Sequence, residues 1–451
     1  MKKLALALTA VGLATSSFAQ MPSQVCQTLS AGNGDQTAQI QQALEACAGG
    51  KGAVVLSSGT YKVSQLSVPA ASYLYLGKGT TLQQEVAMPS NPPSNSQSNP
   101  PSQAEQTKAP PAPMNAPMSL IVVKGDNVTL AGEGTISGSF VEPAGLPPKG
   151  KDKDKDLSKE QEKALKAQEK AQEVKEKQQE KAQKSPHLDR GVLQLPALVK
   201  AEKVANLQVS GLTFTNYHGN ALSLSQVENA KVSGIKVNAK APMTNGVVLD
   251  GVTGANLEKS YLLTSGMQVV VAAQQAPTTG VTLNDNYVYS GTGVVVGLNA
   301  TKGISQVKVN NLVVNEATNG VAVLANAQNG GKISQVSFNN VYAYQTSTPI
   351  HIAANFNQTY NNTGDNIPTF TGINVSNFYS LGGGSVDLAG YSSSNKLAVD
   401  FNNVRVAKVN DWKLYNASIN NLGNSSTGSL SSAAVNEVKD IIESKLVAFP
   451  R

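Results

Sequence analysis

The chain has 451 residues, of which 40% are hydrophobic but only 5% aromatic, and it contains 39 glycines. It can fill a large core, but from small and β-branched side chains, which favours thin, repeated β layers over a bulky globular centre. The net charge of +6 does not indicate a nucleic-acid partner. Residues 149–184 hold 12 of the 36 basic and nine of the 30 acidic residues, and no one-signed cluster with interleaved aromatic residues is present.

The N-terminus has the organisation of a secretory signal. Lys2 and Lys3 precede an apolar run from Leu4 to Ala14, and Ser17-Phe18-Ala19 offers the small residues that a signal peptidase requires. We therefore expect residues 1–19 to be removed. No later apolar stretch reaches the length needed to cross a bilayer, so we predict a secreted or periplasmic protein without a transmembrane segment.

The chain contains two cysteines, Cys26 and Cys47. In an oxidising compartment an isolated pair is more often bridged than free, so we expect a disulfide, with two buried thiols as the alternative. A metal site is not expected, because two ligands without nearby histidines cannot complete a coordination shell.

A short motif recurs along the second half of the chain. Eight copies of an apolar residue followed by polar residues begin at Val209, Val232, Leu257, Leu283, Val309, Phe338, Val375 and Phe401. The steps between them are 23 to 29 residues, with a single step of 37. A period in the twenties is typical of a solenoid with one coil per repeat, so we predict that 20–451 forms one domain.

A second apolar run follows each of several copies of this motif along the chain. These runs begin at Ala221, Val247, Val269, Val294 and Val321. Short alternating runs that end at Gly or Asn are typical of strands joined by tight turns. The sequence therefore predicts an all-β chain of stacked coils, with valines in an inner column and asparagines in amide ladders at the bends.

An exposed terminal coil would be an unpaired sheet edge, so both ends of a solenoid need a cap. Residues 34–44 predict a short helix with an N-terminal capping residue, which would cover the first coil. Residues 432–447 predict a helix with Val435, Val438, Ile442 and Leu446 on one face, which would cover the last coil.

Two segments interrupt the repeat. Residues 84–118 carry nine of the 21 prolines, which predicts an extended loop. Residues 149–184 are rich in Lys, Glu, Gln and Ala and contain few large apolar residues, which predicts a charged helix. This helix is either a solvated arm without chemistry or a segment that contacts a protein or an acidic surface.

The order of landmarks resembles the polygalacturonase-type glycoside hydrolases, family 28. The similarity covers Cys26 to Cys47, Gly132-Glu133-Gly134-Thr135-Ile136-Ser137-Gly138, Asn319-Gly320-Val321 and Pro349-Ile350-His351-Ile352. The resemblance implies a right-handed single-stranded parallel β-helix. It also implies an enzyme that hydrolyses links between galacturonates with inversion, which needs carboxylates on adjacent coils. The family adds a histidine beside them and an Arg-x-Lys pair that holds the substrate's carboxylates.

These motifs have lost their charged residues in this chain. The resemblance places the family's Asn-Thr-Asp on Met243-Thr244-Asn245, its Gly-Asp-Asp on Ser265-Gly266-Met267, its Gly-His-Gly on Gly291-Thr292-Gly293 and its Arg-Ile-Lys on Ala322-Val323-Leu324. We therefore assign no catalytic residue. One interpretation is that the replacements are ordinary coil-facing side chains. The other is a neutral groove formed by Thr244, Asn245, Gly266, Met267, Gln268, Thr292, Ala322 and Leu324.

Other candidates for chemistry are isolated. His187, His218 and His351 lack further ligands, so we expect no metal, and no cofactor-binding motif is present. Asp250 has no visible acidic partner, and Trp412 is the only tryptophan, so aromatic platforms for sugars are scarce.

Three hypotheses follow. The first is a non-hydrolytic module that is structural or binds a polysaccharide or cell-surface glycan. The second is a glycoside hydrolase or lyase with relocated acids, acting on another polysaccharide. The third is an assembly or envelope protein that uses residues 149–184.

Overall fold

The computed structural model describes residues 21–85, 119–139, 192–356, 364–382, 384–407, 411–426 and 430–450. The expected signal peptide at 1–19, the loop expected at 84–118 (beyond residue 85) and the charged helix expected at 149–184 lie outside these residues, and those three assignments stay predictions.

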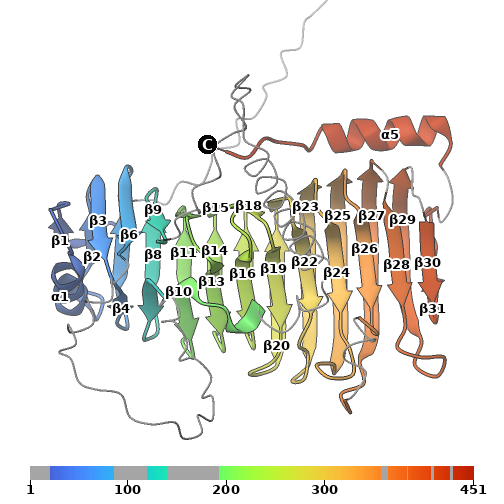
Figure 1. Cartoon of the computed structure of the whole chain (residues 1–451), viewed down its shortest axis with the longest axis horizontal. Helices are drawn as coiled ribbons and strands as arrows, with labels where there is room; N and C mark the ends of the chain where they lie inside the picture. Colours follow the sequence, from blue (N-terminus) through green and yellow to red (C-terminus); the bar gives the residue numbers. More distant parts are fainter. Residues whose placement is uncertain are drawn as a thin grey trace, which may run out of the picture.

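The chain winds into a right-handed parallel β-helix, in which the described residues form a small sheet of 11 strands and a large sheet of 20 strands (Figure 1). The small sheet contains β4 (Leu66–Val68), β7 (Ile121–Val123), β10 (Ala197–Glu202), β13 (Gly219–Ser225), β16 (Thr244–Asp250), β19 (Met267–Ala272), β22 (Thr292–Gly297), β24 (Asn319–Leu324), β26 (Thr348–Ala353), β28 (Ser385–Ala389) and β30 (Asp411–Tyr415).

The large sheet contributes the remaining strands of each coil. They are β1 (Val25–Leu29), β2 (Ala53–Leu56), β3 (Gly59–Val63), β5 (Tyr73–Leu76), β6 (Thr80–Gln84), β8 (Thr129–Gly132), β9 (Thr135–Ser137), β11 (Gln208–Ser210), β12 (Thr213–Thr215), β14 (Lys231–Ser233), β15 (Lys236–Ala239), β17 (Asn256–Glu258), β18 (Tyr261–Thr264), β20 (Thr278–Asn284), β21 (Tyr287–Tyr289), β23 (Ile304–Asn315), β25 (Lys332–Tyr344), β27 (Thr369–Leu381), β29 (Leu397–Ala407) and β31 (Ala417–Asn420).

The repeat read from the sequence is the stacking register of the solenoid. The eight positions from Val209 to Phe401 pair one above another through seven consecutive strand pairings, and all eight side chains are buried. The second set pairs in the same way, with Leu222, Val247, Val269, Val294 and Val321 in one buried column. The predicted valine core is confirmed.

The predicted asparagine ladders are present at the bends. Asn310 Nδ2 donates to Asn284 Oδ1 at 2.9 Å, and Asn339 Nδ2 donates to Asn310 Oδ1 at 3.1 Å. The residues that follow, Asn311 and Asn340, have φ of 54° and 55°, a left-handed conformation that asparagine tolerates better than most residues.

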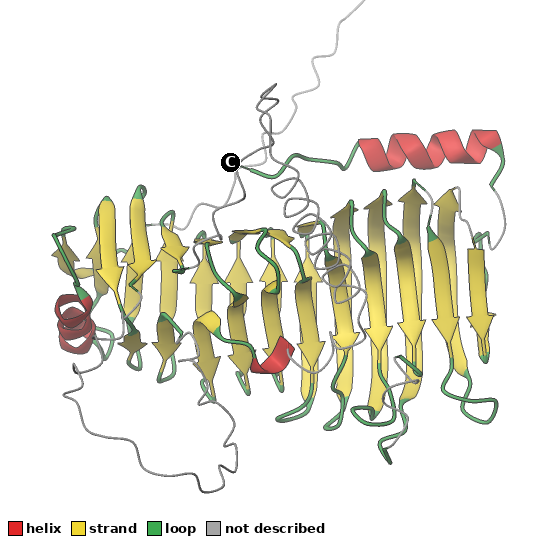
Figure 2. Cartoon of the chain, in the orientation of Figure 1, coloured by secondary structure: helices red, strands yellow, loops and turns green. Residues whose placement is uncertain are grey.

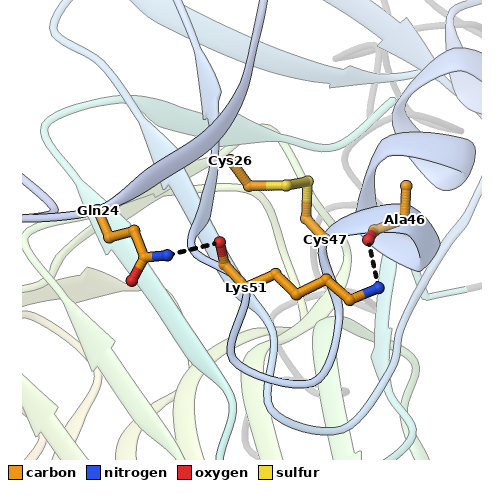
Figure 3. Close-up of a disulfide and its surroundings, with 5 residues drawn as sticks. All are labelled: Gln24, Cys26, Ala46, Cys47 and Lys51. Atoms are coloured by element: carbon orange, nitrogen blue, oxygen red, sulfur yellow. Dashed lines mark hydrogen bonds between the residues drawn. A yellow bond between two sulfur atoms is a disulfide. The ribbon is translucent and has the colours of Figure 1, made fainter.

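A helix and a disulfide close the N-terminal end (Figure 3). Helix α1 (Thr37–Cys47) packs against β1, β2 and β4 and buries Ile40 and Leu44. The predicted disulfide is confirmed, since the sulfurs of Cys26 and Cys47 are 2.05 Å apart. The turn after α1 is held by Lys51, whose Nζ donates to the carbonyl of Ala46 at 3.0 Å.

The C-terminal helix differs from the expected cap over 432–447. Helix α5 (Ser432–Glu443) packs against β25, β27 and β29 on the flank of the solenoid and does not cover its last coil (Figures 1 and 2). Val438 and Ile442 are buried with Leu381 and Ala407 of those strands. The apolar stripe was predicted correctly, but the apolar outer face of three stacked coils offers it more contact than the end of one.

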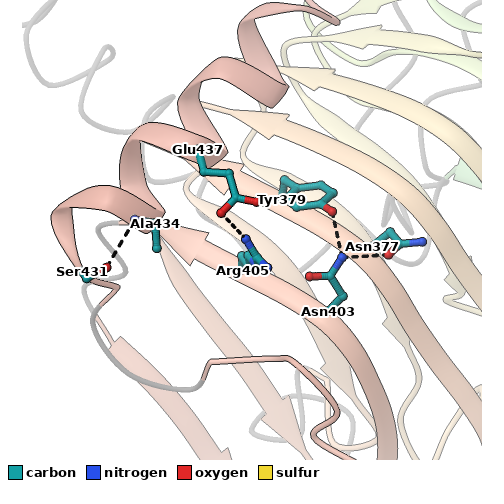
Figure 4. A network of polar contacts seen from close by, with 7 residues as sticks. All are labelled: Asn377, Tyr379, Asn403, Arg405, Ser431, Ala434 and Glu437. Atoms are coloured by element: carbon teal, nitrogen blue, oxygen red, sulfur yellow. Dashed lines mark hydrogen bonds and ion pairs between the residues drawn. The ribbon is translucent and has the colours of Figure 1, made fainter.

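An ion pair fixes the helix in this position. Arg405 of β29 lies 2.7 Å from the Glu437 carboxylate, and Ser431 accepts a hydrogen bond from the Ala434 N–H at the start of the helix (Figure 4). Among the described residues, no helix has the length and apolar character needed to cross a membrane.

Candidate functional site

Some of the residues at which we expect the family's motifs lie on the outer face of the small sheet, since Met267, Ala322 and Leu324 belong to an apolar cluster separate from the core. Parallel pairing stacks the residues of successive strands into rows, and contacts with Val192 and with the apolar cluster outside the core show that the row below faces outward. The row that we call the first row contains Asn220, Asn245, Met267, Thr292 and Asn319 on successive strands. The structure thus brings Asn245, Met267 and Thr292 together.

A chain of amide hydrogen bonds runs through the first row. Asn220 Nδ2 donates to the carbonyl of Val192 at 3.0 Å, and Asn245 Nδ2 donates to Asn220 Oδ1 at 3.0 Å. Asn245 Oδ1 accepts from the Met267 N–H at 2.9 Å, and only 2% of Asn245 is exposed. An amide is required here because it donates on one side and accepts on the other, which a carboxylate cannot do.

Thr244 and Gln268 form hydrogen bonds within the protein. Both are completely buried. Thr244 Oγ1 lies 2.8 Å from the carbonyl oxygens of Ala239 and Ala241, and Gln268 Nε2 donates to the carbonyls of Thr264 and Tyr289 at 3.0 and 3.1 Å. In this conformation the two side chains stabilise the bends of their coils, and they do not face a ligand.

Gly266, where we expect one of the family's acids, leaves no room for a side chain. A Cβ at residue 266 would lie 2.4 Å from Asn245 Oδ1 and 2.6 Å from the Thr244 carbonyl oxygen. Side-chain atoms do not approach other atoms so closely, so no aspartate fits here unless the coil moves.

The family model described as glycosyl hydrolases family 28 matches residues 177–439, more than half of the chain. The chain belongs to this family. Its relatives include an endo-polygalacturonase of Pectobacterium parmentieri, which is 26% identical over 87% of this chain and 90% of the relative.

Solved structures show the same fold. The polygalacturonase from Erwinia carotovora ssp. carotovora matches with a TM-score of 0.66 and 22% identity, over 90% of this chain and 99% of that one. The endo-xylogalacturonan hydrolase from Aspergillus tubingensis matches with a TM-score of 0.53 and 14% identity, over 90% of this chain and all of that one.

An apolar cluster lies beside the first row on the outer face of the small sheet. The second row of outward residues runs from Lys200 through Ser223, Val248, Val270, Val295 and Ala322. From Val248 onward these side chains are at most 1% exposed, and they pack with Met267, Leu324 and Val192. Val192 comes from a short 3-10 helix, η1 (Val192–Gln194), and Phe356 packs at the edge of the cluster. Its members in the described part of the chain are hydrophobic side chains, which do not transfer protons.

Two acids lie beside this cluster, in a third outward row. Glu202 and Asp250 have one strand between them, with Ser225 as the middle residue, so their Cα atoms are roughly 10 Å apart at the usual strand spacing. Lys200 Nζ is 3.0 Å from Glu202, and this contact lowers the pKa of Glu202. Burial raises the pKa of Asp250, although its Oδ1 accepts backbone hydrogen bonds from Gln274 and Gln275 at 2.6 and 3.3 Å.

The second row changes character after Ala322. The next residues in register are His351, Asp387 and Lys413. This group is not evident from the sequence, because the ionisable neighbours of His351 in the row lie 36 and 62 residues further along the chain. Within the described ranges no group of three or more metal-binding side chains occurs.

The remaining candidates have structural contacts. The His218 ring is 3.0 Å from the Pro242 carbonyl oxygen, and Trp412 packs at 6.3 Å from the Phe401 ring. His187 lies outside the described residues.

Proposed function

We propose that this chain is a secreted, non-hydrolytic member of family 28 that binds a polysaccharide. One observation carries the proposal. At the positions where we expect the family's acids, Asn245 is hydrogen-bonded into a neutral ladder, Gly266 has no room for a side chain, and Met267 belongs to an apolar cluster.

Hydrolysis of a glycosidic bond needs one group to protonate the leaving oxygen and another to activate water. A positioned acid or base typically contributes about 10²–10⁴-fold to the rate. Removal of every such group from the site leaves the shape of the β-helix but not the reaction. What supports polysaccharide binding is the retained solenoid of a family whose named relatives are polygalacturonases.

Glu202 and Asp250 favour a second candidate, a hydrolase with relocated acids. Their pKa values are shifted in opposite directions, which is the pattern that separates a base from an acid. We place this candidate second because both carboxylates already have protein partners and Asp250 is only 6% exposed.

A reducing-sugar assay on the secreted protein tests both candidates, with polygalacturonate and several neutral polysaccharides as substrates. We expect no release of reducing ends, and measurable retention of at least one polysaccharide in affinity electrophoresis. Hydrolysis that disappears in Asp250→Asn and Glu202→Gln would establish the second candidate. Hydrolysis that survives both changes would refute both assignments.

A further inference from the structure

The outer face of the small sheet carries a cluster of ionisable side chains beyond the apolar part of the second row. His351 lies between the buried Ile350 and Ile352, and Asp387 lies between the buried Val386 and Leu388. Because side chains alternate along a strand, both point outward. Lys413 is the next residue in register. At the spacing of parallel strands the three residues span roughly 10 Å along the solenoid.

Hydrogen bonds fix the orientation of His351. Asn319 Nδ2 donates to Thr292 Oγ1 at 3.3 Å, so Asn319 Oδ1 is the atom that faces His351 Nδ1, at 3.2 Å. The imidazole therefore donates from Nδ1, and Nε2 is left for another partner. The Phe356 ring packs edge to face at 5.9 Å and forms an apolar wall on one side.

Asp387 and Glu202 each have a lysine nearby, but the contacts of the two acids differ. Glu202 is bound by Lys200 at 3.0 Å. Asp387 has Lys413 next to it in register, yet within the described chain neither side chain has a hydrogen bond or an ion pair. Asp387 is partly exposed and Lys413 is exposed. Both charged groups are therefore available to a ligand.

We propose that Asn319, His351, Asp387 and Lys413, which we call the polar cluster, form a binding site for a neutral sugar of a polysaccharide. The Asp387 carboxylate accepts hydrogen bonds from two adjacent hydroxyls, and His351 Nε2 accepts from a third. Lys413 donates to a hydroxyl or ring oxygen. A few convergent polar groups beside an aromatic wall are typical of small-ligand sites.

The central carboxylate sets the class of sugar. A uronate would bring a second negative charge next to Asp387, and like charges at short range oppose binding. Lys413 is the one lysine of the polar cluster and lies next in register to Asp387, whose charge it offsets, and the apolar positions Ala322 and Leu324 supply no further cation for a uronate. The polar cluster therefore selects neutral hexoses or pentoses over galacturonate. This assignment rests on the proposed function, since it names the ligand class and the place of binding.

Affinity electrophoresis in gels containing galactan, arabinan, dextran or polygalacturonate tests the site. We expect retention in at least one neutral gel. Asp387→Asn and His351→Ala should each weaken binding by about tenfold or more, because each removes hydrogen bonds that involve a charged or oriented group. Asp387→Asn preserves size, so misfolding is not expected, and circular dichroism verifies this. Lys308→Met and Glu228→Gln, on other faces of the solenoid, are the controls and should bind as the wild type does.

Each other outcome contradicts a specific statement. Unchanged binding by Asp387→Asn and His351→Ala would overturn the site and leave the proposed function intact. Retention only in polygalacturonate would overturn the sugar class. If the wild type binds nothing in the panel, both the proposed function and the site fall.

Discussion

The outer face of the small sheet has two halves with opposite properties. From β13 to β24 the outward residues form an amide ladder and an apolar cluster, and most of them are buried. From β26 to β30 the same row carries His351, Asp387 and Lys413, which are partly or fully exposed. The backbone pairing is the same in both halves, so the solenoid alone does not decide what a face can bind. Chemistry depends on which side chains occupy the outward rows.

The largest difference in unfolding free energy between the two halves should follow from a change of side-chain charge. Val270→Asp places a carboxylate among Val248 and Val295, where Val270 is completely buried. An uncompensated buried charge costs about 3–5 kcal/mol of unfolding free energy. Asp387→Val, at an outward position of the other half, should change the unfolding free energy by less than about 1 kcal/mol. Urea unfolding of both variants measures the difference, and equal losses would contradict the contrast.

A smaller difference is expected between two asparagines of the first row. Asn220→Ala leaves the Asn245 Nδ2 donor and the Val192 carbonyl without their partner, and an unsatisfied buried polar group costs about 1–3 kcal/mol. Asn319→Ala removes an asparagine that is only partly buried, so water can replace its bonds and the loss should be smaller. Chemical denaturation of the two variants measures their free energies of unfolding. A larger loss in Asn319→Ala would show that the buried amide ladder does not stabilise the half of the face from β13 to β24 more than the exposed half.

The contrast also shows what could be predicted from the sequence. The core columns were predictable because stacking repeats the same residue type once per coil, as from Val209 to Phe401. The stacking of Asn245, Met267 and Thr292 in one row was predictable, because these residues follow the same period. The inward roles of Thr244 and Gln268 were not, since at a corner of the coil polar side chains can bond to carbonyls or face solvent, and spacing does not distinguish these.

Features that arise only after stacking were missed for a different reason. The apolar surface on which α5 packs is formed by Tyr342, Leu381 and Ala407 from three separate strands. No short stretch of the sequence contains a pattern that predicts this surface. The polar cluster is similar. Asp387 lies 36 residues after His351, because one coil is longer than the rest, and the period that aligned the core did not identify the outward neighbours.

The smallest expected effect is a pH dependence of stability that arises from His351, in the exposed half of the face. Burial lowers the pKa of His351 below its usual value of 6.5, while Asp387 raises the pKa and Lys413 lowers it. The unfolded chain therefore binds a proton on His351 more readily than the folded protein does. The free energy of unfolding should be highest above pH 6.5, where His351 is neutral in both states, and should decrease as the pH falls through 6.5 toward the lower pKa of the folded state.

NMR titration of the His351 ring should show a lower pKa in Asp387→Asn and a higher one in Lys413→Met. His351→Gln should lose the corresponding slope of unfolding free energy against pH, because glutamine does not titrate. A His351 pKa that is indifferent to both neighbours would mean that the three side chains do not share one site, and the open half of the face would then consist of separate solvated charges.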